Sequence, residues 1–309
     1  MVNAGSQRRL TIIRESIYGT PPATPTMKQL RWSTHTLELT KGMLNSTEIR
    51  GDRQLRYLRH GMKRVTGDIA GAMFYGDQDI LWEAALCGAW TSEAAGTPNT
   101  LKAGVTKYSH SIEDGALDIG QYFLYNGMVC EGFAIKTTAA ALCTVQFSFL
   151  GRDNVPSGTS VCASPTAPSD NEPFNSLTGT ITEGGSAIAN VSAIDITLNN
   201  GVDPTEAMGS DKPFDYILGD STITGQLVAY FSDLTLIDKF FNETSSSLSL
   251  VLAGLPTNKT LTINIPHLKY TKGQTGVSGP KGMPITMPFS ALYDSTAASN
   301  IVLTRANPA

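Results

Sequence analysis

Residues 45–73, NSTEIRGDRQLRYLRHGMKRVTGDIAGAM, align without a gap with residues 203–231, DPTEAMGSDKPFDYILGDSTITGQLVAYF, when the sequence is shifted by 158 positions. The identical pairs are Thr47 and Thr205, Glu48 and Glu206, Gly51 and Gly209, Gly61 and Gly219, Thr66 and Thr224, and Gly67 and Gly225. Half of these pairs are glycines, which are hard to replace where the backbone needs a positive φ or a close approach. The match predicts one folding unit used twice.

The match continues on both sides of this stretch. Upstream, residues 37–42 align with residues 196–201 at an offset of 159, and both segments read as an alternating strand that runs into a glycine turn. Downstream, residues 145–150 align with residues 287–292 at an offset of 142, so the second copy is about 16 residues shorter (158 − 142). We expect a first unit with an N-terminal arm at 1–150, a linker at 151–175, and a second unit with a C-terminal arm at 176–309.

The composition is that of a β-rich protein or of one that hides surface in assemblies. Hydrophobic residues make up 41% of the chain, enough for a core in each unit, while charged residues are only 16%. The net charge of −4 argues against a dedicated nucleic-acid binder. The first residues are polar, and no apolar run approaches 18 residues, so we expect neither a secretion signal nor a membrane span.

No motif for chemistry emerges from the sequence. It has no Gly-rich phosphate loop, no HExxH and no GxSxG setting. The cysteines show no CxxC spacing and are expected to be free thiols in a reducing compartment, and the histidines stand far apart; they are Cys87, Cys130, Cys143, Cys162, His35, His60, His110 and His267. We therefore expect no catalytic residue, no metal and no cofactor.

Periodicity predicts the same order of elements in both units. In the first unit we expect strands at 32–40 and 61–75, an amphipathic helix at 77–90 that Asp77 caps and Gly88 ends, and strands at 116–124, 128–137 and 141–150. In the second unit we expect a helix at 233–244 and strands at 248–252, 260–270 and 284–292. The two ends of the chain, 1–9 and 300–309, read as extended arms.

Equivalent loops of the two units carry opposite charge. The segment 41–64 has a net charge of +5 (7 − 2), from the basic residues Lys41, Arg50, Arg53, Arg56, Arg59, Lys63 and Arg64. The segment 199–222 has a net charge of −4 (1 − 5), from the acidic residues Asp203, Glu206, Asp211, Asp215 and Asp220. Each loop can be an ordinary solvated surface, or the two can attract each other between subunits. Binding of nucleic acid by the basic loop is a weaker alternative, because it leaves the acidic loop unexplained.

Several segments together resemble the major tail tube proteins of long, non-contractile-tailed bacteriophages. In the first half they are residues 13–25 (IRESIYGTPPATP), 46–54 (STEIRGDRQ), 65–69 (VTGDI) and 80–90 (ILWEAALCGAW). In the second half they are residues 228–234 (VAYFSDL), 239–244 (KFFNET) and 287–294 (MPFSALYD). The likeness covers nearly the whole chain.

The resemblance implies a mainly β fold with two tandem units of the tail-tube β-sandwich or half-barrel type, each with two packed antiparallel sheets and one flanking α-helix. It implies a structural virion protein, assembled in the host bacterial cytoplasm, whose stacked rings form the conduit for genome ejection. Six single units make a ring in many such tubes, so a duplicated chain is expected to form a trimer with pseudo-sixfold symmetry. The implied partners are the tape measure, tail-tip and terminator proteins, with double-stranded DNA passing through the lumen without specific binding.

In such a tube, we expect the basic and acidic loops to meet between subunits or rings. Strand alternation then assigns to the lumen a polar set without Lys or Arg: Thr66, Asp68, Gln146, Ser148, Thr224, Gln226, Thr286 and Ser290. Two alternatives stay open at this point. One is a tail terminator or tail-tip ring of the same fold, and the other is a β-sandwich adhesin, although Trp32, Trp82 and Trp90 lie where core packing is usual.

Overall fold

The computed structural model describes residues 4–49, 51–52, 54–91, 98–188, 190–230, 233–254, 259–275 and 284–306. Its helices are α1 (Asp79–Leu86) and α2 (Thr235–Phe241), and a short 3-10 turn precedes the first strand (Gly5–Gln7). In the first half of the chain the strands are β1 (Arg8–Arg14), β2 (Lys28–Gln29), β3 (Thr34–His35), β4 (Glu38–Asn45), β5 (Leu58–Ala72), β6 (Asn99–Lys102), β7 (His110–Ala116), β8 (Gln121–Thr138), β9 (Thr144–Gly151) and β10 (Asp153–Ser157).

The second half of the chain continues this β-rich pattern. Its strands are β11 (Thr180–Glu183), β12 (Ser186–Ala187), β13 (Val191–Asn199), β14 (Asp203–Thr205), β15 (Asp215–Ile217), β16 (Thr222–Tyr230), β17 (Ser246–Ala253), β18 (Thr260–Tyr270), β19 (Gln274–Thr275), β20 (Pro284–Ala291) and β21 (Val302–Arg305). The mainly β class expected from the sequence is thus confirmed.

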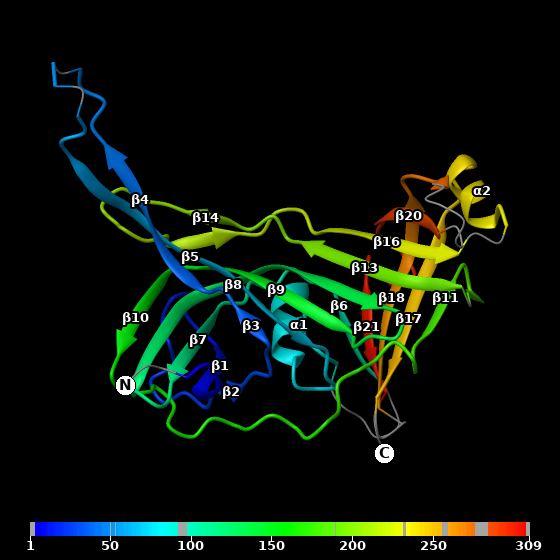
Figure 1. Cartoon of the computed structure of the whole chain (residues 1–309), viewed down its shortest axis with the longest axis horizontal. Coiled ribbons are helices and arrows are strands. Elements are labelled where there is room, and N and C mark those ends of the chain that lie inside the picture. Colours follow the sequence, from blue (N-terminus) through cyan, green and yellow to red (C-terminus); the bar gives the residue numbers. More distant parts are fainter. Residues whose placement is uncertain are drawn as a thin grey trace.

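One antiparallel sheet runs through both halves of the chain. Its order is β4–β5–β9–β8–β13–β16–β20, and the β8–β13 pairing joins the first half to the second. Figure 1 shows these strands lying side by side across the length of the molecule. Along β9 the buried residues Val145, Phe147 and Phe149 alternate with more exposed ones, as expected for a strand with one face on the core.

A second layer forms because two long strands pass from one sheet to the other. The beginning of β8 pairs with β7 and β10, and β7 pairs with β1, whereas the end of β8 lies in the long sheet. In the second half β18 does the same, pairing first with β17 and β21 and then with β20. The apolar side chains between the layers form one core cluster that extends over both halves.

The two halves use their strands in the same order. The first set is β4–β5–β9–β8, and the second set is β13–β16–β20–β18, with β19 continuing β18 along β20. Gly67 lies opposite Phe149 in the first set, and Gly225 lies opposite Phe289 in the second. The last strands therefore correspond at an offset of 140, two residues away from the 142 expected from sequence.

The paired glycines have a common packing reason. A Cβ on Gly67 would lie 2.5 Å from the backbone oxygen of Thr36, and a Cβ on Gly225 would lie 2.4 Å from that of Asp195. No side chain fits at such distances, so only glycine lets each strand approach its neighbour this closely.

Some elements differ from the expected ones. Residues 121–124 and 128–137 are not in two strands but in the single strand β8, while Ala116 ends β7 and residues 117–120 form the turn between β7 and β8. Helix α1 begins at Asp79, because the carboxylate of Asp77 accepts hydrogen bonds from Ser169 and Arg31 and does not cap the helix. Residues 302–305, expected in an extended arm, form β21, which pairs with both β18 and β6. Within the expected linker, β10 pairs with β8.

Candidate assembly surfaces

The β4–β5 hairpin carries the basic segment away from the body of the molecule. Figure 1 shows it as a long projection beyond the sheet. Lys41, Arg56 and Arg59 are exposed on it, and Arg50 and Arg53 lie outside the described residues. Apolar side chains are exposed there as well, including Met43, Leu44, Ile49, Leu55, Tyr57 and Leu58. The apolar character of this projection was not predicted, because the basic residues dominate its sequence.

The acidic segment folds into the short β14–β15 hairpin and reaches the base of the basic hairpin in the same chain. Lys63 Nζ lies 2.8 Å from Asp211 Oδ2, and the Lys63 backbone N–H donates to the Asp211 carbonyl at 2.7 Å. Arg64 lies 3.2 Å from Glu206. The hydrogen bond between the side chains of Lys63 and Asp211 lowers the pKa of Asp211 and raises the pKa of Lys63. Some of the opposite charges of the basic and acidic segments therefore form ion pairs within one chain.

The other acidic candidates lie in two different settings. Asp215 is 3.3 Å from Lys107 of the first half, so it also pairs within the chain. Asp203 and Asp220 are exposed. On the basic hairpin Lys41, Arg56 and Arg59 are exposed as well, and Arg56 lies 3.7 Å from Asp52, so charges of both signs are open to a neighbouring molecule.

All eight polar candidates lie on one face of the long sheet, the face opposite the core. Asp68 pairs directly with Ser148, and Thr224 pairs with Ser290. They alternate with buried residues on each strand, which places the others on this face too: Thr66, Gln146, Gln226 and Thr286. The eight residues thus share one face of the sheet, and their assignment to a lumen stays a prediction.

The same face carries further charged residues that the sequence reasoning did not include, among them Glu38 opposite Thr66 and Lys269 opposite Ser290. Lys136 of β8 is exposed and lies opposite Asp195 of β13, across the joint between the halves. Asp195 also accepts a hydrogen bond from Gln226 Nε2 at 2.6 Å. Strand alternation in the sequence could have placed Lys136 on the same face as Ala134, two residues before it. The structure shows Ala134 opposite Gln146, on the polar face.

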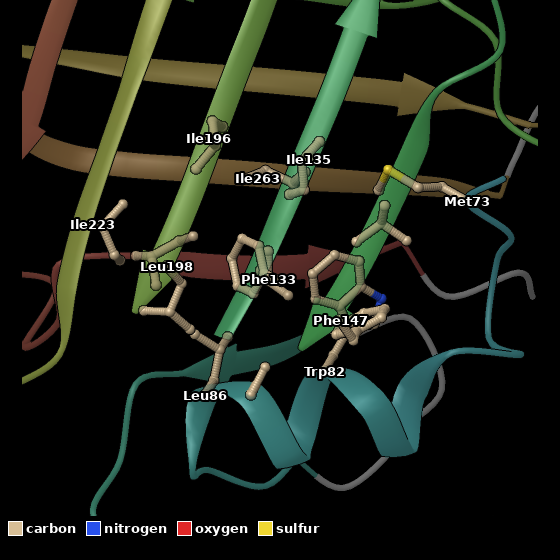
Figure 2. Packing of buried hydrophobic residues seen from close by; sticks show 14 of the residues in the cluster. Met73, Trp82, Leu86, Phe133, Ile135, Phe147, Ile196, Leu198, Ile223 and Ile263 are labelled. Carbon is tan, nitrogen blue, oxygen red and sulfur yellow. The ribbon is translucent and has the colours of Figure 1, made fainter. Parts of the chain in front are cut away.

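Helix α1 supports the joint between β8 and β13 from the core side. Figure 2 shows the helix beneath these strands, with Trp82 near Phe133 and Phe147 and with Leu86 reaching toward Leu198. The Trp82 ring lies 5.2 Å from that of Phe133 and 4.9 Å from that of Phe147. Just after β13, the buried Asn200 side chain donates to the carbonyl of Ala85 at 2.7 Å. Three contacts therefore hold the two halves together: the backbone pairing of β8 with β13, the packing of α1 beneath these strands, and the hydrogen bond from the buried Asn200 side chain.

Other site types are not found in the described part of the chain. There, no group of His, Cys, Asp or Glu side chains is arranged to hold a metal ion, and neither helix is long and apolar enough to span a membrane. All four cysteines are buried free thiols. Burial raises the pKa of the Cys87 thiol to about 11, which keeps it protonated and unreactive at neutral pH.

Among the described residues, the antiparallel sheet has open edge strands and a polar outer face, which suits a structural protein that assembles through its edges. The family model of phage tail tube proteins matches residues 5–291, and the chain belongs to this family. It is thus a structural component of the phage tail, and its family assembles as homo-oligomers into a tube. A comparison with curated proteins finds no match.

Proposed function

We propose that three copies of this chain close into a ring with pseudo-sixfold symmetry, and that stacked rings form the tail tube through which the genome is ejected. The observation that carries this proposal is the β8–β13 joint. It shows how one four-strand set continues antiparallel into the next without a break in the sheet. Repeating that joint between chains by a fixed rotation generates a closed ring.

The common strand order of the two sets supports an internal duplication. Each chain then supplies two of six ring positions, with the first unit at 1–150, the linker at 151–175 and the second unit at 176–309. In this arrangement the polar face of the long sheet lines the lumen. Its hydroxyl and amide groups, with Lys136 opposite Asp195 and with Lys269 offset by Glu38 and Asp68, offer no net positive charge to the phosphates of passing DNA.

The projecting hairpin is suited to contacts between rings. Arg56 and Arg59 of one ring would face the exposed Asp203 and Asp220 of the next, and the exposed apolar residues of the hairpin would be buried in the stack. Tape measure, tail-tip and terminator proteins would then meet the inside or the ends of the tube, assembled in the cytoplasm of the host bacterium.

Electron microscopy of the purified full chain tests this function. We expect long hollow tubes of stacked rings. A double variant Arg56→Glu with Arg59→Glu should still form rings but shorter stacks, and Lys28→Glu on β2, away from the hairpin, should leave tube length unchanged. Isolated rings of the native chain would instead favour a terminator or tail-tip protein, and persistent monomers would contradict both.

A further inference from the structure

The joint inside the chain defines the contact between two chains, and this inference rests on the proposed ring. β4 of the first set corresponds to β13 of the second at an offset of 159, because Glu38 lies opposite Thr66 and Thr197 lies opposite Thr224. The strand that corresponds to β8 is β18 with β19, at an offset of 140. Cys130 and Tyr270 lie opposite Phe149 and Phe289, and Ala134 and Gln274 lie opposite Gln146 and Thr286.

In the part of the chain that the structure describes, the outer edge of β4 and the outer edge of β19 have no strand paired with them. Among the described residues, β4 pairs only with β5, and β19 pairs only with β20. The corresponding edges of β13 in the second half and β8 in the first half are joined to each other within the chain. A row of unpaired backbone groups on a sheet edge is a ready site for another strand.

We propose that β4 of a second copy adds antiparallel to β19 and to the residues just before it, with Thr40 opposite Lys272 and Glu38 opposite Gln274. The register follows from the joint within the chain. There Asn199 lies opposite Gly132 and Thr197 lies opposite Ala134. Subtracting 159 from the first member of each pair and adding 140 to the second gives the two intermolecular pairs.

The exposed face of α2 also supports the addition of β4 from a second copy at this edge. Helix α1 buries Leu81, Trp82, Ala84, Ala85 and Leu86 beneath the internal joint, whereas α2 buries only Ile237 among its described residues. Phe241 of α2 is 70% exposed, and Leu234 just before the helix is 57% exposed. A strand of a second copy, added beside β19, would cover α2 as β13 covers α1.

The position that corresponds to Asn200 is Lys41 (200 − 159). Asn200 fastens the internal joint by donating to the last turn of α1. The exposed Lys41 of a second copy would come to the last turn of α2, where an ammonium group can donate to the terminal carbonyls. Lys41 would then act between neighbours in one ring, and not between rings.

Disulfide trapping in the full chain tests the register. At the internal joint the backbone N–H of Asn200 donates to the Glu131 carbonyl, so the next pair, Asn199 and Gly132, is a non-hydrogen-bonded pair, in which the two Cα atoms lie closest together. The double variants T40C/K272C and E38C/Q274C should therefore form intermolecular disulfides on oxidation, giving covalent dimers and closed trimers on a non-reducing gel. The native cysteines are buried and should not interfere.

The same four positions provide the controls. Recombined as E38C/K272C and T40C/Q274C, they are two residues out of register, about 8 Å apart between Cα atoms, which is too far for a disulfide. Tubes with no cross-link in the matched pairs, or with equal cross-linking in all four variants, would overturn the register but leave the proposed ring intact. Native chains that never form rings would refute the proposed function itself.

Amide hydrogen exchange of the unmodified chain gives a second readout that needs no variant. Residues 38–40 and 272–275 should exchange at least about tenfold more slowly in tubes than in monomers, because their edge amides become paired. Equal exchange in both forms would overturn the proposal.

Discussion

The replacement of Trp82 by alanine probes how strongly α1 holds the joint between the two halves. The Trp82 side chain is 2% exposed and packs edge-on against Phe133 and Phe147 of two adjacent strands. Truncation of a buried tryptophan to alanine costs about 3–5 kcal/mol, since transfer energy is lost and a cavity remains. We expect the free energy of unfolding of the monomer to fall by about 4 kcal/mol.

The expected thermal shift follows from the size of the chain. With about 2.1 cal/mol/K of unfolding entropy per residue, 309 residues give about 0.65 kcal/mol/K, so the loss lowers the melting temperature by about 6 °C. Urea denaturation followed by circular dichroism measures the free energy without relying on tryptophan fluorescence.

The matched control lies on the other helix. Phe241→Ala on α2 removes a side chain that is 70% exposed, and in the monomer it should change stability by less than about 0.5 kcal/mol. A loss below about 1 kcal/mol for Trp82→Ala, or an equal loss for the two variants, would refute the packing argument.

Three further perturbations address the base of the hairpins, the core and the close strand contacts. Lys63→Glu should leave the melting temperature nearly unchanged but speed chymotrypsin cleavage of the hairpin, and exchange of both charges in K63E/D211K should restore protection. Burial and nearby Arg14 lower the pKa of His110 to about 3, so the folded state binds fewer protons at this site and its contribution to stability should fall by about 1.6 kcal/mol between pH 6.5 and pH 5, while Asp79, whose pKa burial raises to about 6, acts in the opposite direction. His110→Leu should therefore lose about that much less stability than the native chain over this range in urea titrations, and equal changes for the two proteins would contradict the argument. Gly225→Ala should cost about 1–3 kcal/mol by the clash with Asp195, whereas Gly158→Ala, where nothing lies within 4 Å, should be neutral; equal melting temperatures would argue against the clash.

The sequence predicted those features that local patterns encode. Periodicity located both helices and the inner part of β5, whereas residues 41–45 and 58–60, expected in a loop, belong to β4 and β5. Alternation placed Thr66, Gln146, Thr224 and Thr286 on one face. The packing of Gly67 and Gly225 against neighbouring strands explains why these glycines recur in the repeat. These features depend on residue type and spacing, which are visible without the fold.

Strand β7 could not be predicted in the same way, because it is polar yet buried. Its residues Glu113 and Asp114 are 1% exposed and pair with Arg9 and Arg8 of β1, a contact between residues more than 100 positions apart. The single strand β8 was missed because Gly127, with φ of +64°, resembles a turn residue, although the strand continues through it.

The ion pairs of the charged segments could not be predicted either, because they also depend on contacts between residues far apart in the sequence. Their opposite signs were visible in the sequence, but the ion pairs Lys63–Asp211 and Arg64–Glu206 depend on where β14–β15 lies relative to β5. Lys136 was overlooked for a related reason: its place opposite Asp195 exists only because the two halves share one sheet.

The number of chains in one ring tests the central claim most directly. Native mass spectrometry of isolated rings, or the symmetry of tubes in electron cryo-microscopy, measures it. Three chains of 32.9 kDa give a ring of about 99 kDa with pseudo-sixfold symmetry, which is the predicted result. A ring of six full chains, about 197 kDa, would contradict the proposal that the two halves of one chain occupy two equivalent ring positions.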